Sequence, residues 1–228
     1  MIKFYTAVGT REIRMMDGKK KMVLSSGDQA YFPSGPEAIL WHSALWVICT
    51  ARELKEVYEN QVSKSHLYPE ISFERYLNHL EEVGLISSGQ AETMEDALYD
   101  LMKDLFIEVP RATPVPLKVK VFLQSVLTGM PIRIAKQIFQ HTDYPGLVGK
   151  ILRAASCNTL TTSELICWGS RDKDFSGDFL ETVYGSKRVP VATGQSGRFA
   201  PERNEFVQAV SQLYLDREIM FEKAGVVK

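Results

Sequence analysis

The feature that most constrains this 228-residue chain is a segment, residues 36–48, that is apolar on nearly every side. As a helix it would present almost no polar face, so other elements must cover it from several directions. Its longest apolar run, Ala38 to Cys49, is interrupted by His42 and Ser43 and is shorter than the roughly 18–20 residues of a membrane span. We therefore expect the central buried helix of a globular domain, and no membrane partner.

The composition is that of an ordinary globular protein, with 45% hydrophobic and 24% charged residues and a net charge of −1. Three cysteines without Cys-x-x-Cys spacing exclude a disulfide scaffold and a zinc ribbon. The N-terminus has no apolar segment followed by a small-residue cleavage site, so the sequence predicts no secretory signal there. The sequence predicts a cytoplasmic, bacterial protein.

The first 33 residues predict a small antiparallel meander. Asp17-Gly18 lies between two apolar stretches, and a glycine after aspartate supplies the positive φ that a tight hairpin turn needs. The four expected strands cover residues 3–8, 11–16, 20–24 and 29–32.

Capping signals predict three helices after these strands. Ser34 is the expected N-cap of the apolar helix, and Thr50 with Glu53 forms the capping-box pattern that begins a second helix. A loop is expected over residues 61–70. Ser72 then begins a third helix, which Gly84 ends. A short strand over residues 85–90 follows.

Three helices followed by a short strand resemble a winged helix-turn-helix over residues 36–90. With the strands in front, the segment is similar to the PqqD-like chaperones of ribosomal peptide modification, which serve pyrroloquinoline quinone biosynthesis. In that family a leader peptide adds a strand to the sheet edge and lies against the third helix. The resemblance implies a peptide site on the strand near Val23–Phe32 and the helix Phe73–Val83. The implied contact residues are Val23, Leu24, Tyr31, Phe73, Tyr76, Leu77 and Leu80. Those chaperones are single domains, so the second half of this chain lies outside the resemblance.

Three prolines within Val109–Leu117, after an amphipathic helix over residues 92–106, predict a domain boundary. The predicted domains are residues 1–108 and 117–228. Residues 117–127 fit a strand or a helix equally well, and helices are expected over 131–140 and 147–156.

The second half repeats a pattern of the first. Thr161 and Glu164 reproduce the capping box of Thr50 and Glu53, 111 residues later, and Phe179-Leu180 with Val183 echoes the third helix. We therefore expect a helix-rich α+β chain of two winged-helix-like units with small antiparallel sheets, the second with a wing over residues 185–200. A final amphipathic helix from Pro201 to Phe221 either docks across its own domain or pairs with a second copy in a homodimer.

Motifs for catalysis are lacking. The chain has no Gly-x-Ser-x-Gly, no phosphate loop, no His-Glu-x-x-His and no dinucleotide fingerprint, and its four histidines are scattered. The sequence predicts a protein that is not an enzyme, with no catalytic residues, no metal and no cofactor.

Charge differs between the halves. Residues 1–114 carry 12 basic and 17 acidic side chains, whereas residues 115–228 carry 15 and 11, a net charge of +4. The leading hypothesis is a transcriptional regulator whose second half contacts double-stranded DNA. The alternative is an adaptor that binds a peptide strand at the N-terminal sheet edge. The DNA-contacting candidates are Arg171, Lys173, Lys187, Arg188, Arg198 and Arg203.

Overall fold

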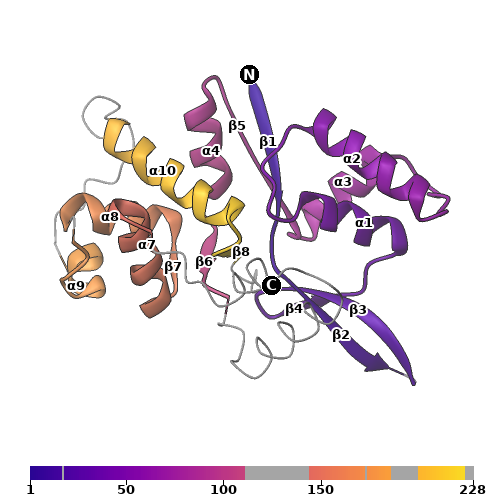
Figure 1. Ribbon diagram of the computed structural model, residues 1–228, viewed down its shortest axis with the longest axis horizontal. Coiled ribbons are helices and arrows are strands. Elements are labelled where there is room, and N and C mark those ends of the chain that lie inside the picture. Colours follow the sequence, from indigo (N-terminus) through magenta and orange to yellow (C-terminus); the bar gives the residue numbers. More distant parts are fainter. Residues whose placement is uncertain (17, 111–143, 173, 186–199, 224–228) are drawn as a thin grey trace, which may run out of the picture.

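The computed structural model describes residues 1–16, 18–110, 144–172, 174–185 and 200–223 (Figure 1). The predicted fold class is confirmed: the chain is helix-rich α+β with small antiparallel sheets. Within the described part, no helix combines the length and the apolar character that crossing a bilayer requires.

The four N-terminal strands lie close to where the sequence places them: β1 (Ile2–Ala7), β2 (Thr10–Met16), β3 (Lys19–Ser26) and β4 (Gln29–Tyr31). The expectation of a single meander is wrong for β1. Strands β2, β3 and β4 form one antiparallel sheet, whereas β1 pairs with β5 (Ile86–Ala91). Gly9 separates β1 from β2 with a φ of +88°, and a Cβ there would lie 2.1 Å from the Ser25 carbonyl oxygen. Only glycine permits this close crossing.

The predicted hairpin is confirmed by the register of β2 and β3 and by the conformation of Gly18. Met16 pairs with Lys19, which leaves a two-residue loop, and Gly18 has a φ of +72°. The outer part of this β2–β3 hairpin projects from the body of the molecule (Figure 1).

The three helices of the first unit begin at the predicted caps: α1 (Gly35–Ala44), α2 (Ala51–Lys64) and α3 (Phe73–Glu82). Their lengths differ from expectation. Helix α1 ends at Ala44, and the chain then extends to Cys49, whose backbone exchanges hydrogen bonds with Tyr5 of 2.8 and 3.2 Å. Helix α2 continues through Lys64, where a loop was expected, because Tyr58 and Val62 keep burying its inner face.

The remaining elements are α4 (Met94–Met102), β6 (Phe106–Glu108), α7 (Gly146–Cys157), β7 (Leu160–Thr161), α8 (Thr162–Arg171), α9 (Phe179–Tyr184), α10 (Ala200–Leu215) and β8 (Met220–Glu222). The capping box of Thr161 and Glu164 is confirmed. The elements expected over 117–127 and 131–140, and the wing apart from its end residues, lie outside the described residues.

The final helix ends earlier than predicted. It stops at Leu215, the chain turns at Arg217 with a φ of +66°, and Phe221 returns to the core from β8. The buried residues of α10 are covered by this chain itself, which is one of the two arrangements expected for the helix.

The two units share a strand order. In the first, β1 lies between the Cys49 bridge and β5; in the second, β6 lies between β7 and β8. Cys49 and Leu160 each stand directly before a threonine-capped helix. This correspondence supports the predicted duplication, which stays a prediction.

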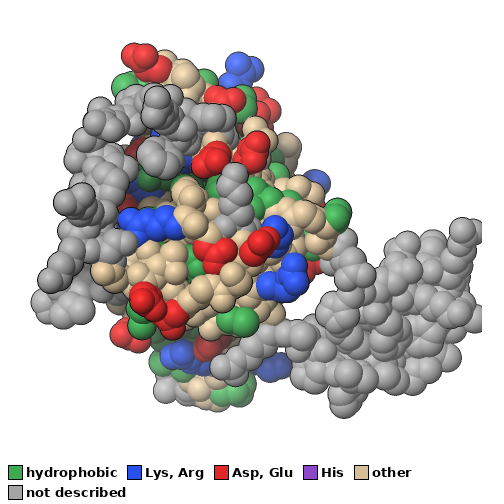
Figure 2. All heavy atoms as spheres, turned by 90° about the vertical axis from the view of Figure 1, so that its left-hand side faces the viewer, with side chains coloured by type: hydrophobic (Ala, Val, Ile, Leu, Met, Phe, Trp, Pro, Cys, Tyr) green, Lys and Arg blue, Asp and Glu red, His purple; other side chains and the backbone are tan. Residues whose placement is uncertain are grey.

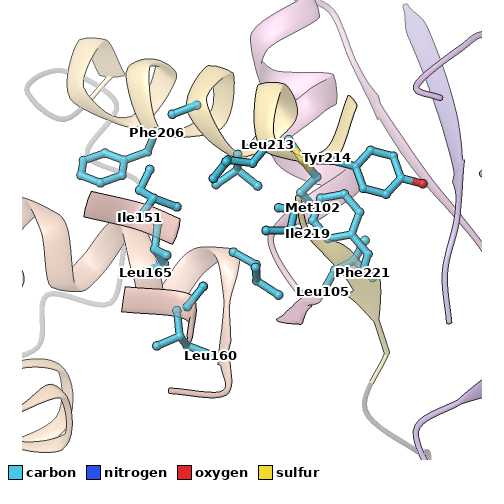
Figure 3. Packing of buried hydrophobic residues seen from close by; sticks show 14 of the residues in the cluster. Met102, Leu105, Ile151, Leu160, Leu165, Phe206, Leu213, Tyr214, Ile219 and Phe221 are labelled. Carbon is cyan, nitrogen blue, oxygen red and sulfur yellow. The ribbon is translucent and has the colours of Figure 1, made fainter. Parts of the chain in front are cut away.

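Two clusters of buried side chains form the core. One joins β1 and β3 to the three helices α1, α2 and α3. The other joins α4 and the β7-β6-β8 sheet to α7, α8 and α10 (Figure 3). Leu101, Met102 and Ile107, which the sequence assigned to the first domain, therefore pack in the second cluster. The predicted boundary itself lies almost entirely outside the described residues and stays a prediction.

Tyr214 of α10 links the second cluster to the first unit. Its hydroxyl oxygen accepts a hydrogen bond from the backbone N–H of Trp46 at 2.9 Å and lies 2.8 Å from the Thr6 hydroxyl oxygen. It also donates to the Ala7 carbonyl at 3.2 Å. The ring is fully buried and stacks on Phe221, as Figure 3 illustrates.

Candidate functional site

The candidate site lies at the outer edge of β4. In the described part of the chain, β4 is the last strand of its sheet and pairs only with β3. Ser26 pairs with Gln29 across a two-residue loop, and such a closing pair exchanges its backbone hydrogen bonds. Because the direction alternates along a strand, the N–H and C=O of Ala30 point away from β3. Ala30 is exposed, and Phe32 is 48% exposed.

Helix α3 reaches β4 through the side chain of His79. Its inner face is buried, and Arg75, Asn78 and His79 are exposed. The rings of Tyr31 and His79 meet edge to face with centroids 5.9 Å apart. Since Arg75 and His79 are four residues apart, they share the face of α3 that meets β4.

A hydrogen-bonded cluster fixes the spacing between β4 and the helices. Tyr31 donates its hydroxyl proton to Glu37 Oε1 at 2.8 Å, and His79 Nε2 lies 3.1 Å from the same hydroxyl oxygen. The Ser34 backbone N–H and hydroxyl donate to Glu37 Oε2 at 2.7 and 2.8 Å. Three elements, β4, α1 and α3, are thus tied together at one carboxylate.

The ionisation of this cluster follows from its contacts. Burial alone would raise the pKa of Glu37, but the hydrogen bonds from Ser34 and Tyr31 and the nearby His79 outweigh it and hold this pKa below its usual value. Burial, the hydrogen bond to Glu37 and its negative charge raise the pKa of Tyr31. At neutral pH the cluster therefore holds a carboxylate and a protonated phenol.

The predicted peptide contacts do not form this surface. Val23 and Leu24 are fully buried, and Phe73, Tyr76, Leu77 and Leu80 are at most 7% exposed, so the protein itself covers these six side chains. Only Tyr31 is partly exposed. The pattern of apolar residues indicated the buried face of each element, whereas a ligand would contact the exposed face. Sequence reasoning missed Ala30, Phe32, Arg75 and His79, although the alternation along β4 and the helical spacing in α3 could have indicated them.

Two of the predicted DNA contacts are described, and both are engaged within the fold. Arg171 donates to the carbonyl oxygens of Thr182 and Val183 near the end of α9. Arg203 pairs with Asp96 of α4 and lies over the Tyr99 ring, 4.9 Å from its centroid. Each of these two guanidinium groups is thus held by other groups of this chain. Lys173, Lys187, Arg188 and Arg198 lie outside the described residues.

The face of the molecule on the second-half side carries mixed charge. Figure 2 shows Lys and Arg side chains interspersed with Asp and Glu among the coloured residues of this face. Lys150, for example, lies 2.6 Å from Asp174. The described part of this face therefore offers no continuous basic surface.

A second polar feature is a hollow beside the β6–β8 pair, lined by Glu108, Glu222 and residues 155–159. Burial, the charge of Glu108 and a hydrogen bond with it raise the pKa of Glu222 to about 7. The Glu222 carboxyl group is thus partly protonated near neutral pH. Among the described residues, no three His, Cys, Asp or Glu side chains are grouped to hold a metal ion.

No family model, curated protein or solved structure matches this chain.

Proposed function

We propose that this chain is a cytoplasmic, non-enzymatic adaptor that binds an extended peptide as an added strand at β4. The observation that carries the proposal is the outward-facing backbone of Ala30, next to Tyr31, whose ring contacts His79 of α3. Strand addition draws its affinity from main-chain hydrogen bonds and its selectivity from alternate side chains. The outward backbone of Ala30 offers the hydrogen bonds, and the side chains of Tyr31 and Phe32 offer contacts for selectivity.

The surrounding side chains suggest how such a peptide is held. One row of its side chains would meet Tyr31 and His79, and the peptide end beyond β4 would lie at exposed Phe32. The cluster of Tyr31, Glu37 and His79 keeps β4 and α3 at a fixed separation. The binding edge is therefore preorganised, which reduces the ordering cost of binding.

A proline at position 30 tests this edge directly. Ala30→Pro removes the outward N–H but none of the hydrogen bonds to β3, and an edge strand tolerates proline. Peptides selected for binding to the parent from a random displayed library should bind the variant about tenfold more weakly or worse. Affinities are measured by calorimetry.

Ala30→Val is the matched control, because it enlarges the side chain, keeps the N–H and favours the strand. It should retain the parent affinity. Equal binding by the proline variant, or a library that yields no binder for the parent, would contradict the adaptor function.

DNA binding by the second half is the other candidate, favoured by the net charge of +4 over residues 115–228. If it holds, changing Lys187, Arg188 and Arg198 together to Ala should weaken binding to any duplex. The slope of log affinity against log salt should fall by roughly 2–3 units, about 0.9 for each lost phosphate contact. Arg75→Ala should change the slope much less, because Glu74 adjoins it. Measuring the binding of a labelled duplex at several salt concentrations tests this prediction. If the parent shows no salt-sensitive binding, this function is excluded.

A further inference from the structure

The β2–β3 hairpin differs in charge from the unit that carries it. Residues 10–21 contain five basic and two acidic side chains, a net charge of +3. The rest of residues 1–114 contains seven basic and fifteen acidic side chains, a net charge of −8. A basic arm therefore projects from an acidic body (Figure 1). Two such arms carry the same net charge, so their pairing depends on the order of the charges along each strand.

Strand β2 is an open edge in the described structure. It is the last strand of the sheet on the side opposite β4, and it spans seven residues without a proline. Six of the seven are exposed, and Ile13 and Met15 are each 65% exposed. A long, exposed edge with apolar side chains is a template for pairing with another strand.

The hairpin geometry fixes which backbone groups are offered. Because Met16 and Lys19 close a two-residue loop, Met16, Arg14 and Glu12 direct their N–H and C=O groups toward β3. The alternate residues Arg11, Ile13 and Met15 direct theirs outward. Any strand that joins this edge must pair with those three.

We propose that β2 pairs antiparallel with β2 of a second copy, about a two-fold axis that passes through the Ile13 pair. This register joins the outward-facing residues of both strands through about six hydrogen bonds. It places Glu12 of each copy opposite Arg14 of the other, and Ile13 opposite Ile13. Opposite charges that face each other across two strands stabilise the pair.

The neighbouring registers are disfavoured by the same chemistry. Moving the axis to position 12 places two glutamates opposite each other, and moving it to position 14 places two arginines opposite each other. Like charges directly opposite are destabilising. Charged residues on an edge usually prevent association, but here their order selects one self-complementary register.

The interface is small, because it joins two seven-residue strands and a few side chains. Interfaces of this size give weak, reversible complexes. We therefore expect a monomer–dimer equilibrium with a dissociation constant of about 10–100 μM. In the dimer, the sheets of the two copies form one six-stranded sheet with a β4 edge at each end.

Charge reversal tests the pairing by sedimentation velocity of the full chain. In a dimer of either single variant, Glu12→Arg or Arg14→Glu, positions 12 and 14 of the two copies carry like charges and face each other at two places. Each variant alone should therefore stay monomeric at about 100 μM, where the parent dimerises. An equimolar mixture of the two variants should dimerise again. In the mixed pair, each new arginine faces a new glutamate, and the unchanged Arg14 of one copy faces the unchanged Glu12 of the other.

This rescue separates pairing between copies from effects within one chain. Both substitutions also break the exposed pair between Arg14 and Glu12, 2.8 Å apart within the strand, and mixing two chains cannot restore that contact. The double reversal E12R/R14E in one chain should dimerise like the parent. Ala30→Pro, at the other edge, should leave dimerisation unchanged whether or not peptides bind there.

The proposal is overturned by a parent that stays monomeric at about 100 μM, or by a mixture that stays as monomeric as its components. Dimers that persist in both single variants would place the interface elsewhere. Binding of a DNA duplex or a polyglutamate peptide to the hairpin of a monomeric parent would assign the basic arm to a different partner.

Discussion

Gly89→Ala should lower the free energy of unfolding by about 3 kcal/mol or more, since it introduces a side chain where two backbones touch. Gly89 lies in β5 directly against α4. A Cβ there would stand 2.1 Å from the Leu101 nitrogen, 2.4 Å from the Leu101 Cα and 2.5 Å from the Ala97 carbonyl oxygen. These are backbone atoms, so no change of rotamer relieves the overlap. Urea unfolding followed by circular dichroism measures the loss.

Gly18→Ala is the matched control for this prediction. Gly18 has a φ of +72°, but a Cβ there would meet no atom within 4 Å. The substitution adds backbone strain alone and should cost about 1–2 kcal/mol. If Gly89→Ala costs no more than Gly18→Ala, the close packing of β5 on α4 is wrong.

Tyr214→Phe should cost about 2–4 kcal/mol, because it removes one oxygen and leaves buried polar groups without a partner. The backbone N–H of Trp46 loses its hydrogen-bond acceptor, and the Ala7 carbonyl oxygen loses a hydrogen-bond donor. Trp46 stands in a left-handed backbone conformation with a φ of +56°, which that hydrogen bond helps to hold. Thermal and urea unfolding both report the change.

Tyr58→Phe makes the same chemical change at another buried tyrosine. The Tyr58 hydroxyl is buried and has no hydrogen-bond partner among the described residues. Its removal should be neutral or stabilising, since a buried unpaired polar group is itself unfavourable. Equal losses in the two variants would show that the hydroxyl of Tyr214 contributes nothing specific.

Local signals in the sequence predicted the elements well. The caps at Ser34, Thr50, Ser72 and Thr161 begin their helices as expected, because a cap is formed by residues three apart. The Asp-Gly turn is predictable for the same reason. These signals need no knowledge of the rest of the fold.

Long-range pairing was not predictable in this way. Nothing near β1 indicates that its partner is β5, because both strands fit a meander equally well and only Gly9 redirects the chain. The end of α10 is another example. Apolar Ile219 and Phe221 continue the helical stripe in the sequence but reach the core after a turn.

The candidate site was predicted at the level of elements and not of side chains. The resemblance led to β4 and α3, yet the contact residues chosen were apolar, and apolar residues on these elements form the core. The role of Arg203 was hidden for a different reason. Its partner Asp96 lies 107 residues earlier, so its charge looked available in the sequence.

The strand order of the second sheet determines when each core cluster can fold during translation. All buried residues of the first cluster lie between Tyr5 and Ile86, so that cluster can assemble while the ribosome is still translating the second half. The second cluster cannot, because it includes Val8 together with Phe221, and the Gly9 N–H donates to the Phe221 carbonyl at 2.7 Å. Contacts this distant in sequence form slowly. Until residue 221 emerges, Val8, Leu101 and Ile107 therefore lack part of their cover on the nascent chain, and during this interval they are exposed to aggregation and to chaperones.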